Sequence, residues 1–134
     1  MPIYMKYEGV SGEVNEKSHK GWVELRFLEF RAPVSKATLI KQRDTASPQF
    51  YREWKWRRGK NVTFDFAHDD GTVYWKVEMK GTLISDISPA SVDSDIETLT
   101  LNFTKIAVTQ PAPLKDQKHA AQLIEFRRIQ QRMS

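Results

Sequence analysis

Apolar and polar residues alternate along most of the chain, a pattern typical of half-buried β-strands. Val23, Leu25 and Phe27, for example, share one predicted face and have charged residues between them. Near the end of the strand-rich part, the apolar phase shifts between Phe103 and Ile106, which indicates a bulge or burial on both faces. The pattern predicts strands over residues 2–8, 22–27, 38–40, 62–67, 73–79, 83–84 and 98–108.

Turn-forming residues separate these segments. Residues 68–71 lie between two alternating segments and predict a β-hairpin, so Asp69 and Asp70 are interpreted as turn residues rather than a catalytic carboxylate pair. Gly81 marks a predicted bulge. The glycines of residues 9–12 have neither the lysine nor the spacing of a phosphate-binding loop, and we interpret them as a flexible turn.

One internal segment has a helical pattern instead. Ser47 favours a helix start because its hydroxyl can cap free backbone N–H groups, and the proline that follows is tolerated in the first turn. Phe50 and Trp54 lie four residues apart and share a face, and Gly59 suits a left-handed residue at the helix end. The sequence therefore predicts one helix over residues 47–58.

The C-terminal segment differs from the rest. After two prolines, apolar residues from Ala120 to Met133 recur at helical spacing and predict a basic amphipathic helix. This helix either docks on the preceding domain or binds a partner, and the sequence leaves both open. The cations among the apolar residues are Arg127, Arg128 and Arg132. We predict a β-domain over residues 1–110 and a helical extension over 111–134.

Together these elements predict a mainly β (α+β) fold. It is a small antiparallel β-barrel of about seven strands with one flanking α-helix, followed by the C-terminal amphipathic helix. The length of 134 residues, 40% of them hydrophobic, suits a single packed domain. So small an interior cannot hold all the aromatic side chains, and some of them are expected in contacts between subunits.

Composition excludes several classes of chemistry. The chain has no cysteine, which rules out disulfides, thiolate metal centres and cysteine nucleophiles. The three histidines lack metal-ligand spacing and are expected in solvent-exposed or loop positions. No apolar run approaches the about 18–20 residues that span a bilayer, and the N-terminus lacks a signal-peptide pattern. We predict no catalytic, cofactor-binding or metal-binding residue, no membrane insertion and synthesis in the cytosol.

The positive charge is concentrated in two places. The chain has 21 basic and 17 acidic residues, a net charge of +4, and residues 111–134 carry three of those net charges. Residues 43–60 hold six basic and two acidic residues. Rings and cations interleave there, a pattern that suggests a single-stranded nucleic-acid contact. The residues concerned are Arg52, Trp54, Lys55, Trp56, Arg57 and Arg58. We favour the alternative in which Phe50 and Trp54 face the core and the cations face solvent.

Four sequence segments follow one another in order: residues 3–13 (IYMKYEGVSGE) with 19–22 (HKGW), 43–48 (RDTASP) with 59–60 (GK), 83–88 (LISDIS) and 98–106 (TLTLNFTKI). In this order they resemble the haemolysin-coregulated protein (Hcp) family of type VI secretion over roughly residues 3–109. The resemblance implies a non-enzymatic barrel that forms hexameric rings. These rings stack into the inner tube of a contractile injection apparatus, which acts as a conduit and carrier for effector proteins.

The resemblance also implies partners and residue roles. The partners are copies of the chain itself, spike, sheath or baseplate proteins, and effector cargo, while nucleic acid is not expected. The protein would start in the bacterial cytoplasm and leave through the apparatus without a cleaved signal peptide. The implied roles are structural: Gly9 and Gly12 lie in the first turn, Asp44, Ser47 and Pro48 at the start of the helix, and Leu101, Asn102, Phe103 and Lys105 in the closing strand.

The sequence departs from the family pattern in two places. Residues 30–36 connect two strands directly, where the family usually has a long glycine-rich loop that reaches neighbouring subunits or rings, so altered stacking is expected. Residues 111–134 continue past the usual closing strand and are compatible with regulation of stacking, binding to a baseplate partner or filling of the lumen. An effector or hydrolase that uses the barrel for delivery is a third hypothesis, which the shortness of the extension disfavours.

Overall fold

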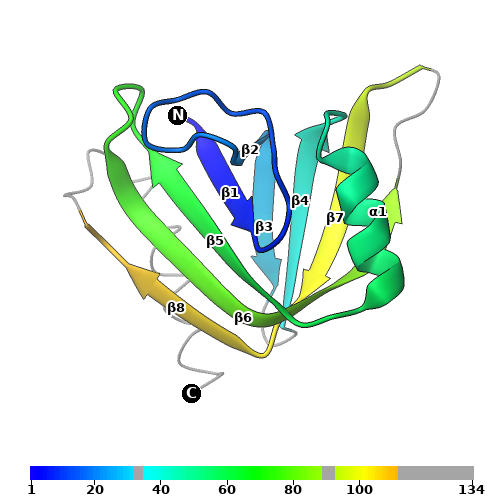
Figure 1. The fold of residues 1–134 in the computed structure, drawn as a ribbon. Helices are drawn as coiled ribbons and strands as arrows, with labels where there is room; N and C mark the ends of the chain where they lie inside the picture. Colours follow the sequence, from blue (N-terminus) through cyan, green and yellow to red (C-terminus); the bar gives the residue numbers. More distant parts are fainter. Residues whose placement is uncertain (32–34, 89–92, 112–134) are drawn as a thin grey trace.

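Antiparallel strands make up most of the computed structural model, which describes residues 1–31, 35–88 and 93–111. The predicted C-terminal helix, with Arg127, Arg128 and Arg132, lies outside the described residues. The elements are β1 (Ile3–Tyr7), β2 (Val23–Leu25), β3 (Phe27–Arg31), β4 (Lys36–Gln42), α1 (Ser47–Trp56), β5 (Lys60–Ala67), β6 (Val73–Ser88), β7 (Ile96–Asn102) and β8 (Lys105–Thr109). Figure 1 shows their arrangement.

The strands close into a barrel because two chain segments pass from one group of strands to another. The order of pairing is β2-β1-β5-β6-β7-β4-β3, and β8 also pairs with β6. The first half of β6 pairs with β5 and β8, while its second half pairs with β7. The second such segment is β2 with β3, because β2 pairs with β1 whereas β3 pairs with β4. Arg26 lies between β2 and β3, and its N–H donates to the Ile40 carbonyl at 2.8 Å. The predicted fold class is confirmed.

The bend of β6 lies at the predicted bulge. The register between β5 and β6 shifts between Lys60 and Val62, so that β6 carries one extra residue there. Gly81 lies in this bulge with a φ of +61°, and a Cβ atom on it would overlap the Thr104 side chain. Thr104 belongs to the short break between β7 and β8, which are successive partners of the same strand. This break explains the shift of apolar phase within the predicted strand 98–108.

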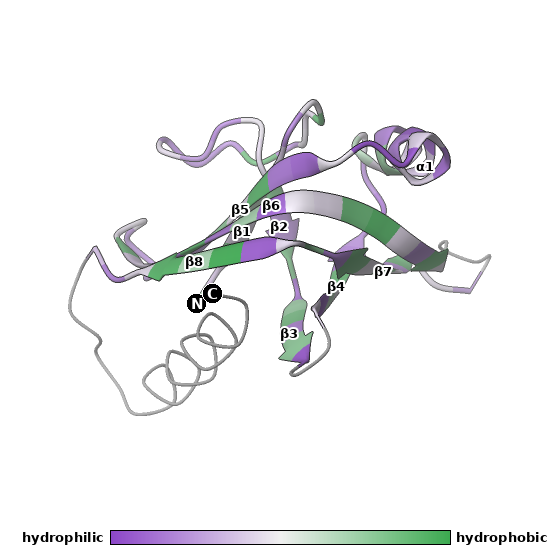
Figure 2. Cartoon of the chain, turned by 90° about the horizontal axis from the view of Figure 1, so that it is seen from below, coloured by the Kyte–Doolittle hydropathy of each residue, from purple (hydrophilic) through white to green (hydrophobic). Residues whose placement is uncertain are grey.

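Inward-facing side chains fill the barrel and contact one another through their rings. Phe66 lies edge-on to Trp75 with ring centroids 5.2 Å apart, and Phe30 lies edge-on to Phe64 at 6.0 Å. Such edge-to-face pairs add stability beyond the area they bury. Fully buried aliphatic members of the same core are Met5, Leu39, Val77 and Leu99. Figures 1 and 2 show the strands around this core and α1 at the side of the barrel.

Two local predictions were wrong. The strand predicted over residues 22–27 is interrupted at Arg26, and the chain changes face there, so Phe27 is 43% exposed while Leu28 and Phe30 are buried. The change of face is what moves the chain from one group of strands to the other. It breaks the simple alternation that placed Phe27 with Val23 in the core.

The ends of α1 also differ from the prediction. The N-cap is Ala46 and no side chain caps it, because the Ser47 hydroxyl is used in contacts with the barrel. The helix ends at Trp56, and Arg57, rather than Gly59, is the left-handed residue, with a φ of +49°. The Arg57 N–H donates to the Glu53 carbonyl at 3.0 Å, which closes the last turn despite the unfavourable backbone angle.

Replacing Gly81 by alanine should destabilise the fold by about 2–4 kcal/mol, because the variant strains a positive φ and displaces Thr104. Gly21→Ala is the matched control: its φ is also positive, at +81°, but nothing lies within 4 Å of a Cβ atom there. We expect the control to lose only about 1 kcal/mol. Chemical denaturation of both variants measures the difference, and equal losses would contradict a role for the contact with Thr104.

Candidate assembly surfaces

A buried ion pair holds α1 against the barrel. Lys41 on β4 and Glu97 on β7 are cross-strand partners whose side chains are almost fully buried, with Nζ and Oε1 2.8 Å apart. Lys41 also contacts Asp44 Oδ1 at 2.9 Å and donates to Ser47 Oγ at 3.2 Å. The Ser47 hydroxyl in turn donates to Glu97 at 2.6 Å. The start of α1 is thereby fixed to two strands of the barrel wall.

This network includes two of the residues that the resemblance placed at the start of the helix, Asp44 and Ser47, while Pro48 is exposed in the first turn. Sequence reasoning missed the two buried charges, Lys41 and Glu97. A signal was present, because Lys41 continues the inward-facing phase of β4 and Glu97 that of β7. A charge at a core-facing position usually has a buried partner.

A second buried cluster holds the loop of residues 8–22 over the outside of β1, β5 and β6. His19 is 1% exposed, with Nδ1 2.5 Å from Glu16 Oε2 and Nε2 2.8 Å from Asp65 Oδ2. Its ring stacks on Tyr4 with centroids 4.4 Å apart. Each ring nitrogen thus lies within hydrogen-bond distance of a carboxylate oxygen, one in the loop and one on β5. His19 lies in a loop, one of the two positions expected of the histidines, but its side chain is buried and not exposed to solvent.

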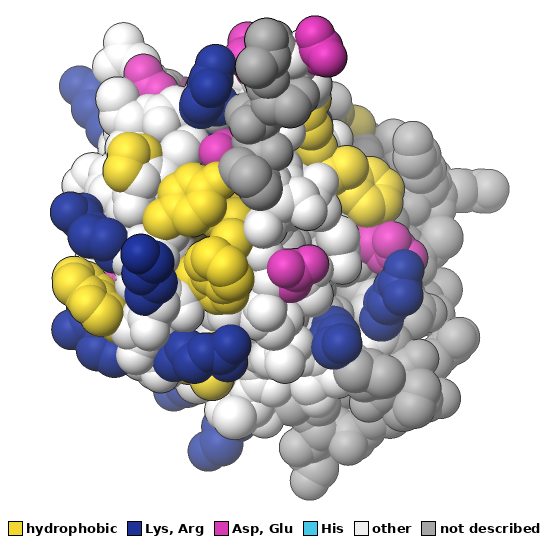
Figure 3. All heavy atoms as spheres, turned by 90° about the vertical axis from the view of Figure 1, so that its right-hand side faces the viewer, with side chains coloured by type: hydrophobic (Ala, Val, Ile, Leu, Met, Phe, Trp, Pro, Cys, Tyr) yellow, Lys and Arg dark blue, Asp and Glu magenta, His cyan; other side chains and the backbone are white. Residues whose placement is uncertain are grey.

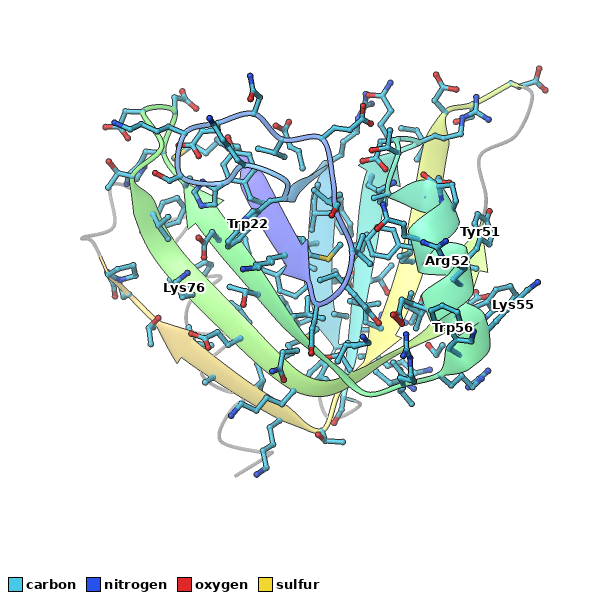
Figure 4. All side chains as sticks on the ribbon, viewed as in Figure 1. Trp22, Tyr51, Arg52, Lys55, Trp56 and Lys76 are labelled. Carbon is cyan, nitrogen blue, oxygen red and sulfur yellow. The ribbon has the colours of Figure 1, made fainter. Side chains whose placement is uncertain are left out.

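The cluster continues into the barrel wall. Asp65 also accepts from Lys76 Nζ at 2.8 Å, and Lys76 lies 5.8 Å from the centre of the Trp22 ring (Figure 4). Asp65 and Lys76 are cross-strand partners of β5 and β6. The loop is thus fixed by a chain of charges that begins in the loop at Glu16 and ends on β6.

The remaining motif residues lie at close approaches of the backbone or at strand ends. A Cβ atom on Gly12 would overlap the Trp22 carbonyl, whereas Gly9 has a positive φ of +84°. Leu101 is buried in β7, and Phe103 is buried beside Phe30 with ring centroids 6.4 Å apart. Asn102 ends β7, and Lys105 is exposed at the start of β8, opposite Lys80.

An open groove lies between the loop of residues 8–22 and the end of the barrel next to the start of α1. Its volume is about 490 Å³. Its acidic lining residues are Glu13, Glu16, Glu24 and Asp44, and its basic ones are Arg26 and Arg43. Burial, followed by the negative charges of Glu24 and Glu16, raises the pKa of the Tyr4 hydroxyl in this groove. We call this the acidic groove.

The outer face of α1 is basic and aromatic. Phe50 is buried in the core and Trp54 packs partly against it, so these rings are not on the solvent face. Trp56 is 56% exposed, and the Arg58 guanidinium lies 4.4 Å from the centre of its ring. Figure 3 shows hydrophobic side chains surrounded by Lys and Arg on this side of the molecule, and Figure 4 shows Arg52 and Lys55 projecting from α1. We call residues 55–58 the basic end of α1.

This geometry does not support the nucleic-acid alternative. Stacking on successive bases requires several exposed rings along a charged groove. Of the two tryptophans proposed for that role, Trp54 packs against the core and only Trp56 is largely exposed. The cations remain accessible, but they surround one ring rather than a row of rings.

The described part of the chain contains neither a metal-binding cluster nor a membrane-spanning helix. Within residues 1–31, 35–88 and 93–111, no group of three or more His, Asp or Glu side chains is placed to hold a metal ion. Among the described elements, no helix has the length and hydropathy needed to cross a membrane. The two features that remain distinctive are therefore the acidic groove and the basic end of α1.

Comparison with known proteins gives a consistent result. The sequence profile of a family described as "Type VI secretion system effector, Hcp" matches residues 29–110. Similar crystal structures include an Hcp protein of Salmonella typhimurium, with a TM-score of 0.75, 18% identity, and coverage of 82% of this chain and 86% of that chain. The crystal structure of a type VI secretion system effector of Yersinia pestis has a TM-score of 0.72 and 21% identity, with coverage of 81% of this chain and 87% of that chain. At these identities the structural likeness shows the fold. No curated protein matches the sequence.

Replacing Lys41 by methionine should destabilise the protein by about 3–5 kcal/mol, because Glu97 would remain buried without its cation. The double variant Lys41→Met/Glu97→Leu should recover most of that loss. The matched control is Arg43→Met, which removes an ion pair with Asp95 whose side chains are both more than half exposed, and which should cost less than about 1 kcal/mol. Denaturant unfolding measures the stability of all three variants. Equal losses for Lys41→Met and Arg43→Met would contradict the assignment of Lys41 and Glu97 as a buried ion pair.

The contact between Glu16 and His19 should make stability depend on acid pH. The hydrogen bond from His19 holds the pKa of Glu16 below its ordinary value of 4.5. The ionised carboxylate therefore stabilises the fold above that value, and the contribution disappears as pH falls through the lower pKa of the folded state. Melting curves of the wild type and Glu16→Gln should be separated at pH 7 and converge as the pH falls well below 4.5. A gap that stays constant with pH would contradict this, and Glu24→Gln is the control on the same groove.

Proposed function

Because the chain belongs to the Hcp family and is a structural component of type VI secretion, we propose that its copies form a hexameric ring and that these rings stack into a tube. The observation that carries this proposal is the family match over residues 29–110, which runs from β3 through β8 and includes α1. The same residues form most of the closed barrel. A closed barrel leaves few free strand edges, so copies would meet through side chains.

The packing of the subunit supports assembly as a rigid unit. Two elements outside the barrel wall are fixed by buried polar contacts: α1 through the ion pair of Lys41, and the loop of residues 8–22 through the hydrogen bonds of His19. Large apolar side chains remain exposed at Phe27 and Trp56. Exposed aromatic side chains at fixed positions are typical of subunit contacts. Cyclic repetition of one such contact would close a ring around an open centre.

We further propose that the tube acts as conduit and carrier. Its cargo would be effector proteins held in the lumen, and its partners the spike, sheath or baseplate proteins of the apparatus. The protein would be made in the bacterial cytoplasm and leave through the apparatus itself, without catalytic activity of its own. The motif residues from Gly9 to Lys105 would then serve the shape of the subunit, and residues 111–134 would form a separate extension.

A mass measurement tests the ring. At micromolar concentration and low salt, the species observed by native mass spectrometry or light scattering should have six times the 15.6 kDa mass of the chain. Negative-stain images of the same sample should show rings with an open centre. The Lys41→Met variant, if it stays folded, serves as a control in which α1 is loosened and ring yield should fall. A wild-type protein that remains monomeric under these conditions would overturn the proposal.

A further inference from the structure

The acidic groove and the basic end of α1 carry opposite charges that the subunit itself compensates only in part. Of the four carboxylates that line the groove, Asp44 is paired with Lys41 and Glu16 is bonded to His19, which leaves Glu13 and Glu24 without an ion pair in the described residues. Of the two guanidinium groups, Arg43 is paired with Asp95 at 3.0 Å, whereas Arg26 donates to the neutral Gln42 at 3.0 Å and keeps its charge. Glu24 is exposed on β2 and forms no ion pair within the described part of the chain. The groove therefore presents net negative charge to a binding partner.

The basic end of α1 has the complementary character. Lys55, Trp56, Arg57 and Arg58 are all exposed. Among the described residues, the acidic partner at this end is Glu53, which is buried and lies 3.4 Å from Arg58 and 3.5 Å from Lys60. In the described residues, Lys55 and Arg57 have no ion-pair partner. The exposed Trp56 ring, with the Arg58 guanidinium against it, therefore lies between the cations of Lys55 and Arg57.

The two features cannot meet within one chain. α1 begins just after Asp44 of the acidic groove, and its ten residues extend about 15 Å before it ends at Trp56. Figure 1 shows the two ends of α1 at opposite ends of the barrel. A contact between groove and helix end therefore requires a second molecule. When both molecules are copies of this chain, the contact joins two different surfaces and can repeat.

We propose that the acidic groove of one copy receives the basic end of α1 from another copy. Trp56 would enter the groove of about 490 Å³ beside Tyr4, and Lys55 and Arg57 would face Glu13 and Glu24. The proposal rests on the proposed function, since it names the contact by which copies of a ring-forming protein meet. A second copy is favoured over another acidic partner because one chain carries both halves of the contact, in both charge and aromatic character.

Charge reversal on each side separately tests the contact. One variant, Lys55→Glu/Arg57→Glu, has an acidic groove and an acidic helix end. The other, Glu13→Lys/Glu24→Lys, has a basic groove and a basic helix end. Either variant alone should assemble at least tenfold more weakly in sedimentation experiments, because like charges meet. An equimolar mixture should regain assembly, since each groove then meets an opposite charge, and a ring of six subunits accommodates strict alternation.

The control is Lys6→Glu/Lys80→Glu, which reverses two exposed lysines outside both surfaces and changes the net charge by the same amount as Lys55→Glu/Arg57→Glu. It should assemble as the wild type does. Trp56→Ala should weaken assembly without any change in charge, and covers the case in which a reversed variant folds poorly. Thermal unfolding checks the folding of each variant.

The outcomes separate this inference from the proposed function. Weak assembly of each variant with recovery in the mixture supports the contact. Variants that assemble as well as the wild type, or a mixture that stays dispersed, overturn it and leave ring formation standing. Binding of an oligonucleotide to the basic end, with assembly unaffected by the reversals, overturns it as well. A wild type that assembles at no salt concentration instead contradicts the ring itself.

Discussion

The bend in β6 at Gly81 is the constraint on which the rest of the fold depends. A single strand of 16 residues pairs with β5 and β8 in its first half and with β7 in its second. Because the extra residue of the bulge lies at the bend, the strand changes direction without losing its partners. The break at Thr104 occurs opposite the same place. The position of α1, which packs against β6, follows from where the two halves diverge.

Two buried clusters of charge then fix the elements that the barrel itself does not hold. Burying an ion pair seldom adds much stability over an apolar pair, because desolvation offsets the Coulombic attraction. Its effect is on position: Lys41 and Glu97 accept only one placement of Ser47, and His19 between Glu16 and Asp65 accepts only one placement of the loop. The acidic groove lies between these two elements, so its shape depends on both clusters.

The sequence predicted the features that depend on the local pattern of apolar and polar residues. Most strand positions, the internal helix α1 and the bulge at Gly81 follow from neighbours in the chain. The buried clusters do not, because His19 lies 46 residues from Asp65 and Lys41 lies 56 residues from Glu97. These pairs can be identified only once the register of the strands is known. Phe27 was misplaced for a related reason, since the change of face at Arg26 reflects the closure of the barrel and not the local pattern.

A rigid subunit with unlike surfaces at its two ends has a definite consequence for assembly. A heterologous contact rotates each copy relative to the last by an angle that the subunit alone determines, and the chain of copies closes only if that angle divides the circle. Loosening α1 or the loop would let the angle vary, and open or irregular assemblies would compete with closed ones. In the proposed ring, the buried polar clusters around Lys41 and His19, although costly to desolvate, would therefore affect the number of copies as well as the fold of each copy.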